Sequence, residues 1–147
     1  MGTRGTIAIQ NADGTVTGIY THWDSYLSHN GVILYEHYNT EERVRELLAL
    51  GDLSSLKPEI GEKHPFSTFE MRKGETWRDE YDNWCTAYGR DRGETGTEAR
   101  TVENWETFLD EYSQEFNYLF VPGSGWRVQY WDNPAQNITL AMLTAEA

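Results

Sequence analysis

Residues 6–20 read TIAIQNADGTVTGIY and predict the β-hairpin around which the rest of the fold is arranged. Two runs rich in β-branched residues, 6–10 and 15–20, flank a turn with the sequence Asn11-Ala12-Asp13-Gly14. An Asp-Gly pair supplies the positive φ angles that tight hairpin turns require. Because side chains alternate along a strand, Ile7 and Ile9 share one face. We therefore expect an antiparallel strand pair at the start of the chain.

A second hairpin is predicted near the other end of the chain. Residues 118–121 (YLFV) and 126–131 (WRVQYW) are aromatic and β-branched, and the turn between them contains a proline and two glycines. A further edge strand is expected at 138–140. The two hairpins together predict a sheet whose strands come from both ends of the sequence.

Three helices are predicted between the hairpins. Residues 31–38 have apolar side chains at helical spacing. A clearer helix begins after Thr40, a good N-cap, and ends at Gly51. The longest helix is predicted over 102–116, where the apolar residues step by three and four.

The order of these elements predicts an α+β fold: an antiparallel sheet built from the N- and C-terminal hairpins, with the helices packed on one face. A chain of 147 residues is the size of one domain, so we expect residues 1–147 to form a single domain. A short strand is expected at 84–88. Periodicity fades over 63–82, where His64-Pro65 marks a break, and we expect an irregular excursion there.

Charge and cysteine content narrow the class of protein. Twenty-four acidic residues against twelve Lys and Arg give a net charge of −12, which opposes direct binding to nucleic acid or to an anionic membrane. The single cysteine, Cys85, suits a reducing compartment. No secretory signal and no membrane-spanning stretch is recognisable. We expect a cytoplasmic protein without a metal or another cofactor.

A cluster of titratable and aromatic residues follows the first hairpin. His22, Asp24 and His29 lie within eight positions, and such groups can bind a ligand or transfer protons when a fold brings them together. Their spacing is not an established metal-binding pattern. The alternative is that His22 is a partly buried sheet residue and that Asp24 caps a turn.

Two arginines form a second candidate site. Arg90 and Arg92 lie in the glycine-bounded segment YGRDRGE, residues 88–94, and could grip a phosphate or a carboxylate. The spacing is not that of a known nucleotide-binding loop. An internal network with Asp91 or Glu94 is the alternative.

The third candidate is the acidic side of the predicted helix 102–116. One explanation for these carboxylates is that they form the solvated face of the helix. The other is imitation of nucleic-acid phosphates, which the scarcity of lysine (three in the chain) keeps open. The candidate partner-binding carboxylates are Glu103, Glu106, Asp110, Glu111 and Glu115.

Several segments resemble a family of small hypothetical proteins encoded by tailed bacteriophages and prophages. They are MGTRGTI (1–7), YTHWDSY (20–26) with Gly31 and Leu34, LGDLSSL (50–56), YGRDRGE (88–94) and YLF (118–120). The resemblance covers most of the chain except about 63–82. It implies a phage accessory protein in a bacterial host cell, but it carries no catalytic residues with it.

The leading hypothesis is therefore an acidic phage accessory protein, a binding protein rather than an enzyme, that binds and inhibits a host protein with a basic surface. Such a partner would be a defence or nucleic-acid-processing protein, and exposed tryptophans such as Trp77, Trp84 or Trp131 would anchor it. The alternative is a protein that binds or hydrolyses a small ligand or nucleotide in a pocket formed by His22, Asp24, His29, Arg90 and Arg92. Homodimerisation through the aromatic surface is a third possibility.

Overall fold

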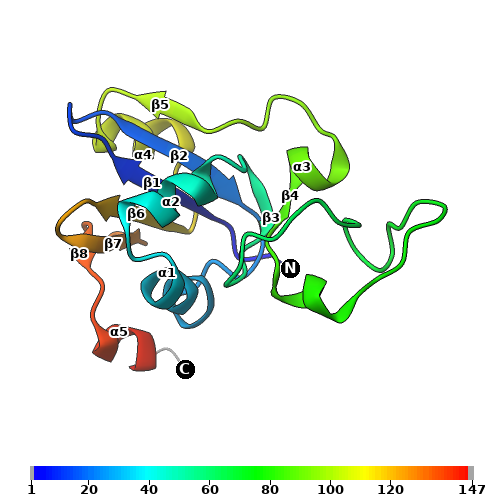
Figure 1. The fold of residues 1–147 in the computed structure, drawn as a ribbon. Coiled ribbons are helices and arrows are strands. Elements are labelled where there is room, and N and C mark those ends of the chain that lie inside the picture. The colour runs from blue at the N-terminus through cyan, green and yellow to red at the C-terminus, as the bar shows by residue number, and fades with distance from the viewer. Residues whose placement is uncertain (1, 146–147) are drawn as a thin grey trace.

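The fold is an α+β structure with a sheet of eight strands (Figure 1). The computed structural model describes residues 2–145, so Met1 and the last two residues of the predicted 1–147 domain lie outside the described part. The strand order is β4-β3-β2-β1-β6-β7-β8, and β5 pairs with β2. The strands are β1 (Gly5–Gln10), β2 (Val16–Thr21), β3 (Leu53–Ser55), β4 (Thr86–Ala87), β5 (Arg100–Val102), β6 (Phe116–Val121), β7 (Gly125–Tyr130) and β8 (Gln136–Asn137).

Both predicted hairpins are confirmed. β1 and β2 are antiparallel with Ile7 opposite Ile19, and Gly14 in their turn has a φ of 89°. β6 and β7 are antiparallel with Phe120 opposite Trp126. The edge strand expected at 138–140 lies slightly earlier, as β8, and Leu140 instead begins a helix.

The prediction of a purely antiparallel sheet is wrong, because the sheet is mixed. β1 pairs with β6 in parallel, and β2 pairs with β3 in parallel. In both β1 and β6 the first five residues are buried without interruption, whereas β7 alternates between buried and partly exposed positions. Continuous burial is typical of strands that are covered on both faces. The two hairpins therefore join through their first strands at the centre of the sheet.

Helical segments join and flank the strands. Helix α2 has its predicted cap, because Thr40 Oγ1 accepts a hydrogen bond of 3.2 Å from the Arg43 amide. Short helix α3 covers most of the glycine-bounded segment 88–94 that contains the two arginines. The helices are α1 (Val32–His37), α2 (Glu41–Leu48), α3 (Tyr88–Arg92), α4 (Trp105–Tyr112) and α5 (Leu140–Ala145), with a π-helical turn η1 (Leu27–Gly31) and a 3₁₀ helix η2 (Asp79–Asn83).

Two apolar clusters lie against the sheet, and helices contribute to both. Ile7 and Ile9 belong to the larger cluster, with residues of α1, α2 and α5. Ala8 belongs to the smaller cluster, with Phe108 of α4. Since neighbouring side chains of a strand point to opposite faces, these contacts place α4 across the sheet from α2 and do not fit helices packed on one face only.

Helix α4 is shorter than the predicted helix 102–116. It begins after Asn104, whose side-chain oxygen accepts a hydrogen bond of 2.8 Å from the Thr107 amide. Val102 belongs to β5 and Phe116 to β6. Apolar residues at helical spacing thus extended the predicted helix into the strands on either side.

Residues 63–78, all of which are described, form neither helix nor strand and extend away from the sheet (Figure 1). Helix η2 follows them and leads back to β4. Within residues 2–145, no helix has both the length and the hydropathy needed to cross a membrane.

Candidate functional site

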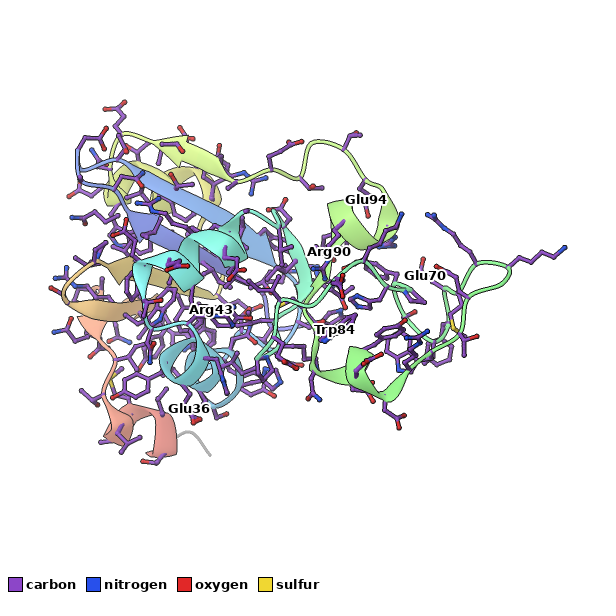
Figure 2. The ribbon with its side chains drawn as sticks, in the orientation of Figure 1. Glu36, Arg43, Glu70, Trp84, Arg90 and Glu94 are labelled. Carbon is purple, nitrogen blue, oxygen red and sulfur yellow. The ribbon has the colours of Figure 1, made fainter. Side chains whose placement is uncertain are left out.

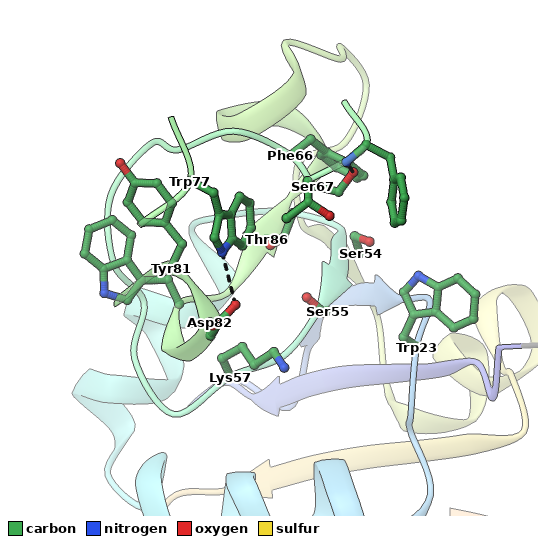
Figure 3. Close-up of a pocket in the computed structure, with 13 residues that line it drawn as sticks. Trp23, Ser54, Ser55, Lys57, Phe66, Ser67, Trp77, Tyr81, Asp82 and Thr86 are labelled. Atoms are coloured by element: carbon green, nitrogen blue, oxygen red, sulfur yellow. Dashed lines mark hydrogen bonds between the residues drawn. The ribbon is translucent and has the colours of Figure 1, made fainter. Parts of the chain in front are cut away.

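A cavity of about 640 Å³ lies between the β3–β4 end of the sheet and the excursion (Figure 3). Its lining combines aromatic rings with hydroxyl groups. We call it the aromatic cavity, and its lining residues are Trp23, Ser54, Ser55, Lys57, Phe66, Ser67, Thr68, Phe69, Trp77, Tyr81, Asp82, Trp84 and Thr86.

The first wall of the aromatic cavity is Trp23, which the end of β2 positions. The amides of His22 and Trp23 donate to the carbonyls of Leu53 and Ser54, at 3.0 and 3.1 Å, and this extends the β2–β3 pairing. Asp24 then has a φ of 58°, so the chain turns directly after Trp23. The indole is 41 % exposed and meets the His22 ring edge-on, with centroids 4.8 Å apart.

The opposite wall is an aromatic cluster around His64. The ring centroids of Tyr81, Trp84 and Trp77 lie 5.2, 5.7 and 6.2 Å from that of His64. The Trp77 indole N–H donates to Asp82 Oδ1 at 3.2 Å, which fixes the ring at the cavity wall (Figure 3). These contacts give the excursion a packed base although it has no regular structure up to η2.

The floor between the two walls carries hydroxyl groups from β3 and β4. In Figure 3, Ser54, Ser55 and Thr86 lie between Trp23 on one side and Trp77 with Tyr81 on the other. The imidazole of His64, behind Thr86, is buried.

The hydrogen-bond partners of His64 indicate which of its ring nitrogens carries the hydrogen in the neutral form. His64 Nδ1 lies 2.8 Å from the Glu62 carbonyl oxygen, which can only accept. In the neutral imidazole Nδ1 therefore carries the hydrogen, and Nε2 accepts from the Thr86 hydroxyl at 3.3 Å. The Thr86 oxygen is then left with lone pairs to offer to the cavity.

Asp91 and Arg90 form a buried network that ties the excursion to the fold. The Asp91 carboxylate accepts from the amides of His64 and Ala87, at 3.2 and 2.8 Å, and pairs with the Arg90 guanidinium at 3.0 Å. Arg90, labelled in Figure 2, also donates to the carbonyls of Ile60 and Cys85, at 2.8 and 2.7 Å. Backbone before and after the excursion is thereby held by one ion pair.

The structure uses His22, Asp24 and His29 in separate local contacts. His22 Nδ1 lies 2.7 Å from the Tyr20 hydroxyl, and His29 Nδ1 lies 2.9 Å from Asn30 Oδ1. Asp24 accepts from the Asn30 amide through its backbone carbonyl. Within residues 2–145, no cluster of three His, Cys, Asp or Glu side chains could hold a metal ion.

The two predicted arginines also have separate roles. Arg90 belongs to the buried network with Asp91 described above. Arg92 lies over the Phe66 ring, 4.2 Å from its centroid, and forms exposed ion pairs with Glu70 and Glu94. Among the described side chains, no hydrogen bond, ion pair or ring contact joins either arginine to His22, Asp24 or His29, so nothing in these contacts supports the hypothesis of a common pocket.

The predicted partner-binding carboxylates lie on and beside α4. Three are on the helix, while Glu103 precedes it and Glu115 follows it, contrary to the longer helix that was predicted. All five residues are exposed, and none takes part in an ion pair among the described residues. We call this set the acidic surface: Glu103, Glu106, Asp110, Glu111 and Glu115.

The buried Cys85 thiol is expected to be inert in the folded protein. It has no exposed surface, and burial raises its pKa, so little thiolate forms near neutral pH. We predict negligible reaction with a thiol reagent such as DTNB under native conditions and one reactive thiol per chain in concentrated guanidinium chloride. Fast native labelling would instead reveal local opening of the β4 region.

Comparisons of this chain with known protein families, with curated proteins and with solved structures find no match. The resemblance to phage-encoded proteins therefore stays a prediction.

The sequence interpretation missed the aromatic cavity. Its residues come from four separate segments, and no local pattern links Trp23 to Trp77 or Thr86. The one signal was the density of aromatic residues between positions 64 and 88, within a stretch that lacks helical or strand periodicity. Aromatic side chains in such a stretch need a packing partner, which is here the cluster around His64.

Proposed function

We propose that this protein is a binding protein that docks its acidic surface onto a basic surface of a partner protein. The observation that supports this is the grouping of five exposed carboxylates on and beside one short helix, α4. Among the described residues, none of the five forms an ion pair. Unpaired like charges oppose one another and favour association with a positive partner.

The spacing of the carboxylates supports charge mimicry as the mode of binding. Glu106 and Asp110 are one helical turn apart, which is about 6 Å along the axis of α4. Two steps along one DNA strand cover a similar length, roughly 7 Å. In the phage setting that the resemblance implies, the partner would be a bacterial defence or nucleic-acid-processing protein, and the acidic surface would inhibit it by occupying its nucleic-acid groove.

Charge reversal tests this proposal. Asp110→Lys with Glu111→Lys should reduce capture of the partner from a bacterial lysate at least tenfold, because two attractive charges become repulsive. Lysine near the end of α4 is compatible with the helix dipole, so the fold should persist. Capture would be measured by quantitative mass spectrometry at low and high salt.

The matched control is Glu36→Lys with Glu59→Lys. Both residues are exposed and lie outside the acidic surface, and the pair changes the net charge by the same amount. Specific docking predicts normal capture by this control and salt-sensitive capture by the native chain. The proposal would be contradicted if both double variants lost capture of the partner equally. It would also be contradicted if the captured protein bound equally well after substitution of Asp110 and Glu111. A solution mass twice that of the chain would instead favour homodimerisation.

A further inference from the structure

We propose that the aromatic cavity is a binding site for a neutral saccharide. This site is separate from the acidic surface and does not depend on the function proposed above. The inference rests on three properties of the cavity: its walls, its floor and its charge.

The walls offer aromatic faces that the fold leaves accessible. Trp23 is 41 % exposed and Phe69 is 96 % exposed, although large apolar side chains usually lie inside. Exposed aromatic groups gathered at a concave site indicate a binding surface. The face of an indole ring carries partial negative charge, which attracts the polarised C–H groups of a sugar ring.

The walls are also held in place before any ligand arrives. Trp77 is fixed by its hydrogen bond to Asp82, and Trp23 by the backbone pairing to Ser54 and by the edge of His22. The histidine of the HWD segment thus positions a tryptophan of the cavity wall. Side chains that are already ordered lose less entropy on binding.

The lining offers hydrogen bonds of both kinds, from Thr86 on the floor and from Ser67 in the excursion, as sugar hydroxyls require. With a neutral His64 that carries its hydrogen on Nδ1, the Thr86 hydroxyl donates to Nε2, and its oxygen can accept from a ligand O–H. Ser67 Oγ accepts from the Phe69 amide at 3.2 Å, so its hydrogen can be donated to a ligand oxygen. Sugar hydroxyls, which donate and accept at once, match such a surface.

The charge of the cavity favours a neutral ligand. One cation, Lys57, and one anion, Asp82, are among its lining residues, and no arginine is. The whole chain carries −12, so a phosphorylated ligand would be repelled at long range. The volume of about 640 Å³ falls within the range of roughly 300–1,000 Å³ that is usual for ligand sites.

The test is a titration of the full chain with neutral trisaccharides, namely maltotriose, cellotriose and N,N′,N″-triacetylchitotriose, followed by tryptophan fluorescence and by calorimetry. At least one should give a saturable signal below about 10 mM, a concentration at which weak ligands still register. Trp23→Ala should weaken that binding at least tenfold. Thr86→Val, which removes the hydroxyl at nearly constant volume, should weaken it about threefold to tenfold.

Trp131→Ala is the matched control, since Trp131 is 74 % exposed and lies outside the cavity. It should leave saccharide affinity unchanged. Neither Trp23 nor Thr86 lies in the excursion, so loss of binding in these variants with unchanged circular dichroism reports on the site itself. No binding by any trisaccharide would overturn the proposal. So would binding that Trp131→Ala weakens as strongly as Trp23→Ala, or binding of adenosine alone.

Discussion

Arg90→Met is expected to lower the free energy of unfolding by roughly 3–5 kcal/mol. The variant keeps much of the apolar stem but removes the guanidinium from the Asp91 carboxylate, which has no exposed side-chain surface and then has only the His64 imidazole, 3.5 Å away, beside it. An unpaired buried charge is among the most destabilising changes in a protein. The carbonyls of Ile60 and Cys85 lose their guanidinium donors as well.

Arg92→Met serves as the control, two positions along α3. The Arg92 side chain is 38 % exposed and pairs with exposed glutamates, so its loss should cost no more than about 1 kcal/mol. Urea denaturation followed by fluorescence and by circular dichroism measures both variants. Equal destabilisation would mean that the Arg90–Asp91 pair does not hold the excursion against the fold.

Phe108→Ala is the second substitution with a large expected effect, about 3–5 kcal/mol of destabilisation. Phe108 has no exposed surface and packs with Ala8, Val16 and Leu119 in the smaller apolar cluster. Removal of the ring leaves a cavity under α4. Phe69→Ala is the same substitution at a side chain that is 96 % exposed, and it should change stability by no more than about 0.5 kcal/mol.

Gly18 provides a second test of the α4 contact. A Cβ atom added at Gly18 would lie 2.5 Å from Cζ of Phe108 and 2.9 Å from Cβ of Ala8. Gly18→Ala should therefore destabilise the native chain but be better tolerated once Phe108 is alanine. A double-mutant cycle measures this coupling by chemical denaturation. Strict additivity would show that α4 does not press against β2 at this position.

Parts of the fold that depend on neighbouring residues were predictable. The Asp13-Gly14 turn and the β-branched runs beside it predicted the first hairpin, and Thr40 marked the start of α2. The boundaries of α4 were less predictable, because Val102 and Phe116 continue its apolar spacing although they belong to strands. Val102 packs against the same smaller cluster as α4, whereas Phe116 belongs to the larger one, and helical periodicity alone distinguishes neither from a helix residue.

The candidate sites also differ in whether they depend on residue composition or on contacts between distant segments. Charge composition pointed to the acidic surface, and its exposure and lack of ion pairs are visible in the structure. By contrast, the alternative pocket with His22 and Arg90 would need contacts between distant segments, and among the described residues His22 bonds to Tyr20 and Arg90 to Ile60. His22 lies against a cavity wall that sequence patterns did not reveal.

The α+β class, both hairpins, the cap of α2 and the excess of acidic charge can be predicted from the amino-acid sequence, since they follow from residue type and from interactions over a few positions. The parallel pairing of β1 with β6, in which Thr6 bonds to Asn117 across 111 positions, depends instead on contacts between distant segments. The same is true of the position of α4 and of the assembly of the aromatic cavity. Such contacts form where distant segments together bury the most apolar surface and satisfy their polar groups, and no local pattern encodes which segments will meet.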